Sequence, residues 1–186
     1  MNDVRRTVRR VHITGGQGSG KTTLARRIGA RLGVPVYDLD SVWWDARTGA
    51  ERSLDERLAL AQRLAAQPGW VTEVTPLGWT DPLFRVADLI VWMDVPWRVA
   101  VWRMVGRHIR AGLAGNNRHP GLRKLAQFIW YTKGYYRSDA PPLPVPADGE
   151  GQATRAETAY RLAAYPDKAV HCRGTGDLRA LFARLD

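Results

Sequence analysis

Cysteines and long apolar runs are scarce in this chain of 186 residues. No apolar run approaches the ~20 residues that a membrane span needs. The basic N-terminus is not followed by an apolar segment, so we read no signal peptide and expect a cytoplasmic protein without a membrane partner. Cys172 is the single cysteine, which excludes an intramolecular disulfide and a cysteine-based metal cluster.

Acidic residues are absent from one long stretch. The chain has 28 Lys and Arg against 18 Asp and Glu, a formal charge of +10, yet residues 95–138 contain no Asp or Glu. The nine basic residues of that stretch are Arg98, Arg103, Arg107, Arg110, Arg118, Arg123, Lys124, Lys133 and Arg137. Such a balance predicts anionic partners, which include nucleotides, phosphorylated metabolites and nucleic acid.

Length and composition favour one folded domain over residues 1–186. Residue patterns predict strands over 8–14, 36–38, 70–74, 89–94 and 168–172, and helices over 21–32, 53–67, 96–109, 121–136, 153–164 and 177–185. Because strands alternate with helices, we expect an α/β fold with a parallel sheet covered on both faces. We expect a polar loop over 112–120 and, from four prolines and two glycines, a mobile connection over 139–152.

A phosphate-binding motif follows the first predicted strand. Residues Gly15, Gly16, Gln17, Gly18, Ser19, Gly20, Lys21 and Thr22 match GxxxxGK[ST], and a predicted helix follows at once. Glycines let main-chain N–H groups point at phosphate, and the helix start adds its positive dipole end. Lys21 is expected to reach the β- and γ-phosphates and Thr22 to bind Mg²⁺, with Thr23 beside them. The motif predicts nucleotide binding, and the lack of an NKxD sequence disfavours a GTPase.

Three further features accompany the motif: Tyr37-Asp38-Leu39-Asp40 before Val42-Trp43-Trp44, the strand-end Glu73, and residues 89–96 (LIVWMDVP) leading into an Arg-rich helix. With them the chain resembles the small P-loop kinases related to adenylate kinase and shikimate kinase, and among these the topology modulation proteins and adenylate-kinase-like P-loop proteins. The resemblance implies a three-layer P-loop NTPase fold with strand order 2-3-1-4-5 and a helical lid over 95–138. It also implies an ATP-dependent phosphotransferase that uses Mg²⁺ and a small-molecule or nucleotide acceptor.

The same resemblance assigns acidic residues to the acceptor side. Asp40 is predicted to bind the acceptor or act as general base, although it could instead cap a following turn. Asp38 and Glu73 are predicted near Mg²⁺, and Glu73 is predicted to be catalytic, holding either Mg²⁺-bound water or the acceptor. Adenylate kinases carry Asp-Gly-x-Pro-Arg where this chain has Glu73-Val-Thr-Pro-Leu77, which removes a phosphate-gripping arginine, makes AMP a poor candidate and leaves Arg85 as the nearest substitute. Asp94 either serves catalysis or caps the helix that begins near Pro96.

Arginines of the predicted lid would close over ATP in such a kinase. Arg103, Arg107 and Arg110 share one helix face, and we assign Arg103 and Arg107 catalytic roles, with Arg118 and Arg123 as second choices. The segment starting at Arg173 is expected beside the adenine. Trp43 and Trp44 are candidates for an acceptor pocket, whereas Trp70 and Trp92 are expected in the core.

Two other functions fit part of the sequence. A P-loop ATPase that binds nucleic acid through the basic stretch is supported by Arg5, Arg6, Arg9, Arg10 and interleaved aromatics, but no recognisable nucleic-acid motif is present. A regulatory ATPase without an acceptor is the other. The sequence favours the kinase, and it leaves the acceptor and a monomeric or dimeric state open.

Overall fold

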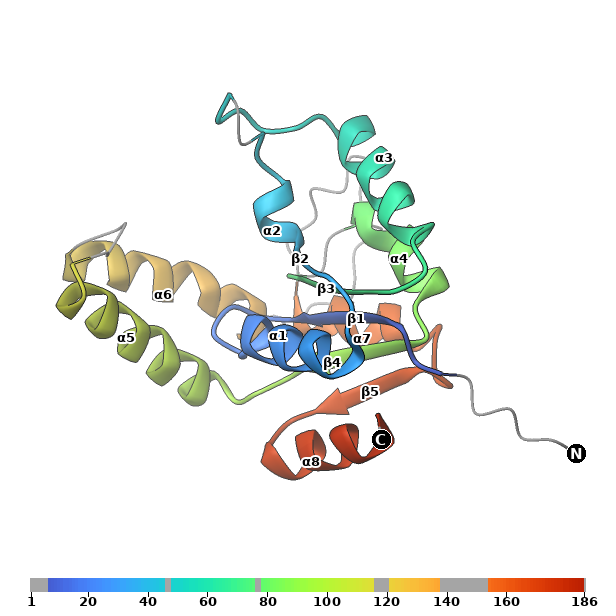
Figure 1. The fold of residues 1–186 in the computed structure, drawn as a ribbon. Coiled ribbons are helices and arrows are strands. Elements are labelled where there is room, and N and C mark those ends of the chain that lie inside the picture. Colours follow the sequence, from blue (N-terminus) through green and yellow to red (C-terminus); the bar gives the residue numbers. More distant parts are fainter. Residues whose placement is uncertain (1–6, 46–47, 76–77, 116–120, 138–153, 186) are drawn as a thin grey trace, which may run out of the picture.

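The computed structural model describes residues 7–45, 48–75, 78–115, 121–137 and 154–185 (Figure 1). Five parallel strands form one sheet in the order β2-β3-β1-β4-β5. The strands are β1 (Arg10–Gly15), β2 (Val36–Asp38), β3 (Trp70–Val74), β4 (Leu89–Met93) and β5 (Ala169–Cys172). This topology, with helices on both faces, confirms the predicted fold class. In the described part of the chain, no helix is long and apolar enough to cross a membrane.

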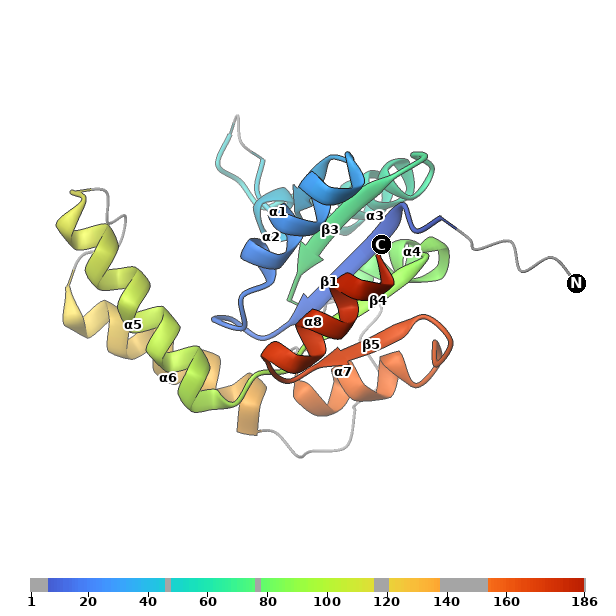
Figure 2. The same ribbon diagram turned by 60° about the horizontal axis from the view of Figure 1, so that its bottom comes forward.

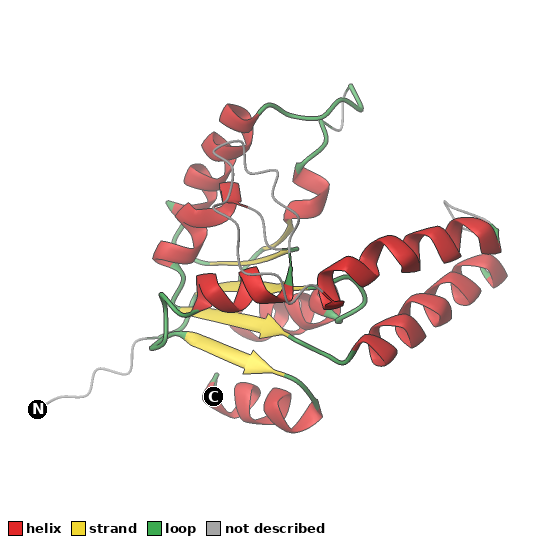
Figure 3. Ribbon diagram, turned by 180° about the vertical axis from the view of Figure 1, so that it is seen from behind, coloured by secondary structure: helices red, strands yellow, loops and turns green. Residues whose placement is uncertain are grey.

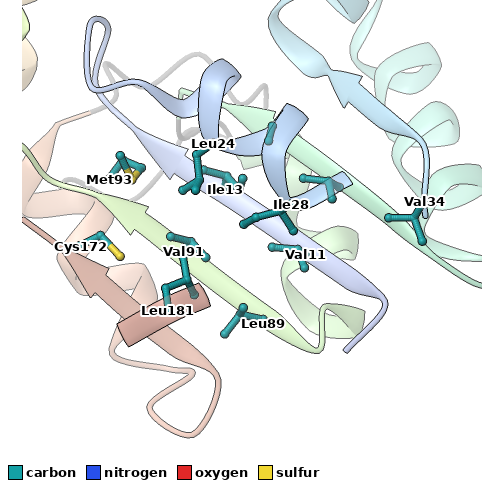
Figure 4. Packing of buried hydrophobic residues seen from close by; sticks show 12 residues of the cluster. Val11, Ile13, Leu24, Ile28, Val34, Leu89, Val91, Met93, Cys172 and Leu181 are labelled. Atoms are coloured by element: carbon teal, nitrogen blue, oxygen red, sulfur yellow. The ribbon is translucent and has the colours of Figure 1, made fainter. Parts of the chain in front are cut away.

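Helices α1 (Lys21–Leu32) and α8 (Thr175–Arg184) cover one face of the sheet (Figure 2). Side chains alternate along a strand, so Val11 and Ile13 of β1 point to this face and pack with Ile28 of α1 (Figure 4). Val91 of β4 and Leu181 of α8 extend the same cluster. This packing fixes the start of α1, and therefore Lys21, beside the end of β1.

Helices α2 (Leu39–Val42), α3 (Leu54–Ala65), α4 (Asp81–Val86) and α7 (Arg155–Leu162), with the short 3₁₀ turn η1 (Gly78–Thr80), lie on the other face. Trp70, Ile90 and Trp92 turn to this side, as the alternation requires, and pack with Phe84 and Leu162. Trp70 and Trp92 are therefore core residues, as predicted. Ser53 and Glu56 form the predicted capping box at the start of α3.

A helical hairpin, α5 (Trp97–Leu113) and α6 (Leu122–Arg137), projects from the body of the molecule (Figures 1 and 3). We call these two helices the hairpin. At its base, Ala100 and Met104 of α5 pack with Ile129 and Tyr136 of α6 and with Val95. The hairpin occupies the place where the resemblance predicted a helical lid.

Predicted and observed elements differ in a few places. Helix α5 runs four residues past the predicted end at Ile109, because Gly112 is tolerated inside it and the chain turns only at Gly115, where φ is +66°. Helices α2 and α4 were not predicted, since four and six residues are too few to show a helical period. The connection predicted over 139–152 lies outside the described residues.

Candidate active site

A cavity of about 780 Å³ lies at the end of the sheet where β1 runs into α1. Its basic lining residues are Lys21, Arg26, Arg27, Arg103, Arg107 and Arg110, and its acidic ones are Asp38, Asp40 and Glu73. The bases come from α1 and α5, whereas the acids come from β2, α2 and β3. The cavity therefore has a cationic side and an anionic side, and Lys21 lies where they meet.

The loop from Gly15 to Gly20 forms the phosphate-binding motif. At Gly18, φ is +77°, and a Cβ there would lie 2.7 Å from the carbonyl oxygen of Ala100, so only glycine fits without strain. At Gly16, a Cβ would meet the Tyr135 ring at 2.5 Å. Gln17, Gly18 and Gly20 line the cavity, whereas the Ser19 side chain is buried behind the loop.

Lys21 is only 7% exposed and folds back over the loop, where its Nζ donates to the Gly16 carbonyl at 3.2 Å. Burial lowers the pKa of Lys21, and the nearby carboxylates of Asp40 and Glu73 oppose that shift. The Lys21 cation lies near acids on one side and beside the phosphate-binding loop on the other. That is the placement expected for a lysine that contacts phosphate.

Thr22 and Glu73 form the tightest polar contact between the two sides of the cavity. The Thr22 hydroxyl donates to Glu73 Oε1 at 2.6 Å. Glu73 reaches this point because β3 pairs in parallel with β1, opposite Ile13, and with β2, opposite Asp38. Burial raises the pKa of Glu73, and the bond from Thr22 and the charge of Lys21 partly offset this.

Asp38 and Asp40 follow β2 and have different partners. Asp38 caps α2, since its Oδ1 accepts from the main-chain N–H groups of Asp40 and Ser41. The turn therefore has Asp38 as its cap and leaves Asp40 free of that role. Asp40 Oδ1 accepts from the Thr75 N–H at 3.4 Å, and Asp40 lines the cavity. Partial burial raises the pKa of Asp40, while Lys21 opposes the rise.

Three arginines of α5 reach the cavity. Arg103 donates from Nη1 to the Ser19 carbonyl at 2.5 Å, which joins the hairpin to the phosphate-binding loop. Arg107 and Arg110 line the cavity on the same helix face, as their spacing predicted. Arg123 lies on the exposed surface of α6 and does not line the cavity, and Arg118 lies outside the described residues.

Two consecutive tyrosines at the end of α6 make the second attachment between hairpin and loop. The Tyr136 hydroxyl donates to the Gln17 carbonyl at 2.8 Å. Tyr135 lies beside Gly16, and its hydroxyl accepts from Trp92 Nε1 at 3.1 Å and meets the Thr158 hydroxyl at 3.2 Å. Burial raises the pKa of Tyr135 to about 12, so this hydroxyl stays protonated at neutral pH. These contacts join the end of α6 to the phosphate-binding loop.

Asp94 does not cap α5, which begins at Trp97 with Pro96 in the N-cap position and without a side-chain cap. Its Oδ2 pairs instead with Arg155 at 2.7 Å and with His171 Nε2 at 2.8 Å. The His171 ring also stacks on Trp92, with 4.1 Å between ring centroids. Asp94 therefore ties β4 to β5 and α7, which is a structural role.

Arg173 follows β5 but does not line the main cavity. Its main-chain N–H donates to Asp177 Oδ2 at 2.8 Å. A second cavity of about 470 Å³ adjoins the main cavity. It is lined by Arg27, Thr175, Leu178, Arg179, Phe182 and Ala183. Arg27 and Leu178 line both cavities, so the two cavities share a wall formed by α1 and α8.

The structure brings together most of the residues that the sequence predicted. Lys21, Thr22, Asp38, Asp40, Glu73, Arg103 and Arg107 all line one cavity. Trp43 and Trp44 do not line this cavity. The Arg57 guanidinium lies over the Trp43 ring, 3.8 Å from its centroid, and the main chain of Trp44 forms an isolated antiparallel bridge with Glu51. Arg85 is also not among its lining residues.

The sequence reasoning missed several contributors. Arg26 and Arg27 follow the motif by one helical turn, so their spacing from Thr22 was an available signal. Tyr135 and Tyr136 gave no signal, because their contacts with the loop join residues more than 110 positions apart in the sequence.

These residues fit a Mg²⁺–nucleotide. Within the described ranges, no three His, Cys, Asp or Glu side chains lie close enough to hold a metal ion on their own. Mg²⁺ is usually held by one or two carboxylates together with substrate phosphates and water, and Glu73 beside Thr22 supplies such a partial site. At Gly16 and Gly18 a Cβ would meet Tyr135 and Ala100, so these glycines let the loop lie close against the hairpin.

Comparisons with known proteins give one sequence relative and several similar structures. No protein-family model matches the chain. Uncharacterized protein YqaC of Bacillus subtilis (strain 168) is 29% identical over 118 residues, which span 63% of this chain and 65% of that protein. The alignment therefore leaves about a third of the relative's own length unmatched.

Among solved structures, a gluconokinase from Sinorhizobium meliloti 1021 matches with a TM-score of 0.48 and 21% identity, covering 97% of this chain and 93% of the other. Shikimate kinase from Acinetobacter baumannii in complex with shikimate matches with a TM-score of 0.43 and 15% identity, covering 87% and 96%. A sugar kinase from Janibacter sp. HTCC2649 matches with a TM-score of 0.43 and 19% identity, covering 88% and 99%. Each TM-score is below 0.5, and the proposal that follows rests on this chain's own residues.

Proposed function

We propose that the protein is an ATP-dependent phosphotransferase that moves the γ-phosphoryl group to a hydroxyl of a small acceptor, with Mg²⁺. The observation that carries this is the sharing of one cavity by the Lys21–Thr22 pair, the carboxylates of Asp40 and Glu73, and Arg103. An ATPase would use the Lys21–Thr22 pair together with one residue that positions the attacking water. Asp40 is a second carboxylate, placed apart from the Thr22–Glu73 contact. Its presence favours an enzyme that binds an acceptor.

Each side chain has a place in the transfer. Residues 15–23 hold the triphosphate, with Lys21 on its outer phosphates. Thr22 and Glu73, with Asp38 nearby, would hold Mg²⁺, and the ion would supply positive charge to the phosphates. Asp40 takes the proton from the acceptor hydroxyl as that oxygen bonds to the γ-phosphorus and the bond to the β–γ bridging oxygen breaks. Arg103 and Arg107 stabilise the charge that develops, and ADP leaves.

The acceptor side of the cavity disfavours an anionic acceptor. Asp38, Asp40 and Glu73 are its acids, and the basic residues that line the cavity come from α1 and α5. No arginine in the described part of residues 36–86 lines the cavity. A neutral, hydroxyl-rich molecule avoids the repulsion that a phosphorylated acceptor would meet here.

The direct test is ATP consumption with Mg²⁺ against pooled nucleosides, nucleotides, sugars, other hydroxylated metabolites and aminoglycosides. ADP release and new product masses are followed together. Acceptor-dependent ADP release, with a product heavier by one HPO₃, is the expected result. ADP release that no acceptor changes would instead support the acceptor-free ATPase.

We expect Arg103→Ala to slow transfer by about 10³-fold while weakening ATP binding much less, because charge on the phosphoryl group grows in the transition state. Single-turnover transfer and equilibrium ATP binding separate the two effects. Arg98→Ala, one turn earlier and outside the cavity lining, is the matched control. A larger loss of ATP affinity than of rate would make Arg103 a binding residue only.

We expect the acid limb of the kcat/KM profile to lie at a higher pH than an ordinary aspartate would give. The base works deprotonated, and burial raises the pKa of both Asp40 and Glu73, so activity is lost at a higher pH as the medium is acidified. The charge of Asp38 contributes to both shifts. Asp38→Asn should therefore move the limb to lower pH, while asparagine still caps α2.

The pH profile of the exposed Asp55→Asn variant is the control, and it should match the wild type. An acid limb near pH 4, the range of an unperturbed carboxyl, would contradict the role of buried carboxylates.

A further inference from the structure

Exposed apolar side chains collect on the hairpin formed by α5 and α6. Twelve large hydrophobic side chains of the described chain are exposed, and eight of them lie on this hairpin. They are Val99, Trp102, Ile109, Leu113, Leu122, Phe128, Trp130 and Tyr131. Exposed apolar groups gathered in this way indicate a contact surface rather than ordinary scatter.

The charge of the hairpin restricts what can cover it. Residues 95–138 contain no acid, and the described part of that stretch carries eight of its nine basic residues. A second copy of the chain would bring the same positive charge against it, which disfavours self-association through this face. The partner that complements it is anionic.

The contact surface on α5 is separate from the face that lines the cavity. Arg103, Arg107 and Arg110 face the cavity, whereas Trp102, Ile109 and Leu113 recur at i, i+7 and i+11. At 3.6 residues per turn, this second stripe lies about 100° around the helix from the arginines. It therefore remains available while the arginines serve the cavity.

The exposed apolar residues of α6 do not form one face. Trp130 and Tyr131 are consecutive, at 77% and 71% exposure, and Leu122 and Phe128 point in further directions. A bilayer requires a single apolar face with charges opposite. A flexible polyanion with flat bases has no such requirement, because it can bend around the hairpin and stack on aromatic rings wherever they project.

From this arrangement we propose that the hairpin binds single-stranded nucleic acid, with bases stacked on Trp102, Trp130 and Tyr131 and phosphates on the neighbouring Arg123, Lys124 and Lys133. Positive charge that follows the backbone, combined with exposed aromatic rings, is the arrangement by which proteins hold single strands without sequence preference. This binding is independent of the proposed phosphoryl transfer.

The test is fluorescence anisotropy of a labelled oligothymidylate of about 12 nucleotides with the full-length protein. We expect binding whose affinity falls steeply with salt. The Trp102→Ala/Trp130→Ala double variant should lose about 100-fold, since each stacking ring contributes about tenfold. Trp44→Ala is the matched control, because Trp44 is also exposed, at 53%, but lies away from the hairpin.

Two further variants separate this proposal from the kinase proposal and from misfolding. Lys21→Ala should bind the strand as the wild type does, so loss of ATP turnover and loss of strand binding are independent results. Thermal unfolding of the double variant should stay close to the wild type, because both tryptophans are largely solvent-exposed. Arg123→Ala/Lys124→Ala should reduce affinity and flatten the salt dependence, whereas the exposed Arg63→Ala on α3 should not.

Three outcomes would overturn the proposal. The first is no strand binding at micromolar protein in low salt. The second is binding that the double tryptophan variant leaves unchanged. The third is tighter binding to phosphatidylglycerol vesicles or to duplex DNA than to the single strand, with loss in the same variants, which would make the partner a bilayer or a duplex.

Discussion

Replacing Lys21 by alanine is expected to lower phosphoryl transfer by at least about 10³-fold and leave the fold intact. A preorganised donor aimed at developing charge is typically worth 10²–10³ in rate, and Lys21 adds a full positive charge to the donor. It also lies next to both Asp40 and Glu73, so its loss leaves two carboxylates facing an incoming polyphosphate. Quenched-flow transfer and ATP binding by calorimetry would both show the defect.

The fold should survive because the Lys21 side chain, although buried, lines the cavity and is not part of the hydrophobic clusters of the described chain. Its one described hydrogen bond is to the Gly16 carbonyl at 3.2 Å, and burial of its charge is itself unfavourable, as its lowered pKa shows. We expect the free energy of unfolding to change by no more than about 1 kcal/mol, measured by denaturant unfolding. Lys21→Arg is the informative second variant, since the planar guanidinium keeps the charge but not the compact shape.

Wild-type transfer in Lys21→Ala would contradict the assignment of this loop as the phosphate site. A loss of both transfer and folding stability would instead make Lys21 a structural residue. Recovery of most of the rate in Lys21→Arg would show that charge matters here and that shape does not.

The sequence allowed the central part of the site to be predicted because its signals are local. The phosphate-binding motif lies within eight consecutive residues, and helix α1 starts at Lys21, as the motif requires. Asp38 is the last residue of β2, Asp40 follows it, and Glu73 lies next to the end of β3. In a sheet of parallel strands in the order β2-β3-β1, the carboxyl ends of the strands lie at the same edge, so these carboxylates lie close together there.

What the sequence did not reveal depends on contacts between distant segments. Tyr136 reaches Gln17 across 119 positions, and no spacing rule reports such a contact. Asp94 was expected to cap a helix or serve catalysis, but its partners Arg155 and His171 are 61 and 77 positions away. The sequence does not show which of Asp38 and Asp40 caps the turn, and only the turn geometry identifies Asp38 as the cap.

Replacing Asp40 by asparagine is the most specific test of the acceptor side. We expect transfer to fall by about 10²–10⁴-fold, the usual contribution of a general base, while ATP affinity stays close to the wild type. Asparagine has the same shape, and its side-chain oxygen can still accept from the Thr75 N–H, so the loop after β3 should be undisturbed. Rate and affinity therefore report on different functions of one cavity.

Asp38→Asn is the matched control for Asp40→Asn, two residues away on the same turn. It removes one carboxylate from the same cavity but keeps the cap of α2, so transfer near neutral pH should fall far less than in Asp40→Asn. Transfer at the full rate in Asp40→Asn would show that Asp40 is not the base. Equal losses in the two variants would point to the summed negative charge of the acceptor side, and a loss confined to Asp40→Asn would leave proton removal as the role of that carboxylate.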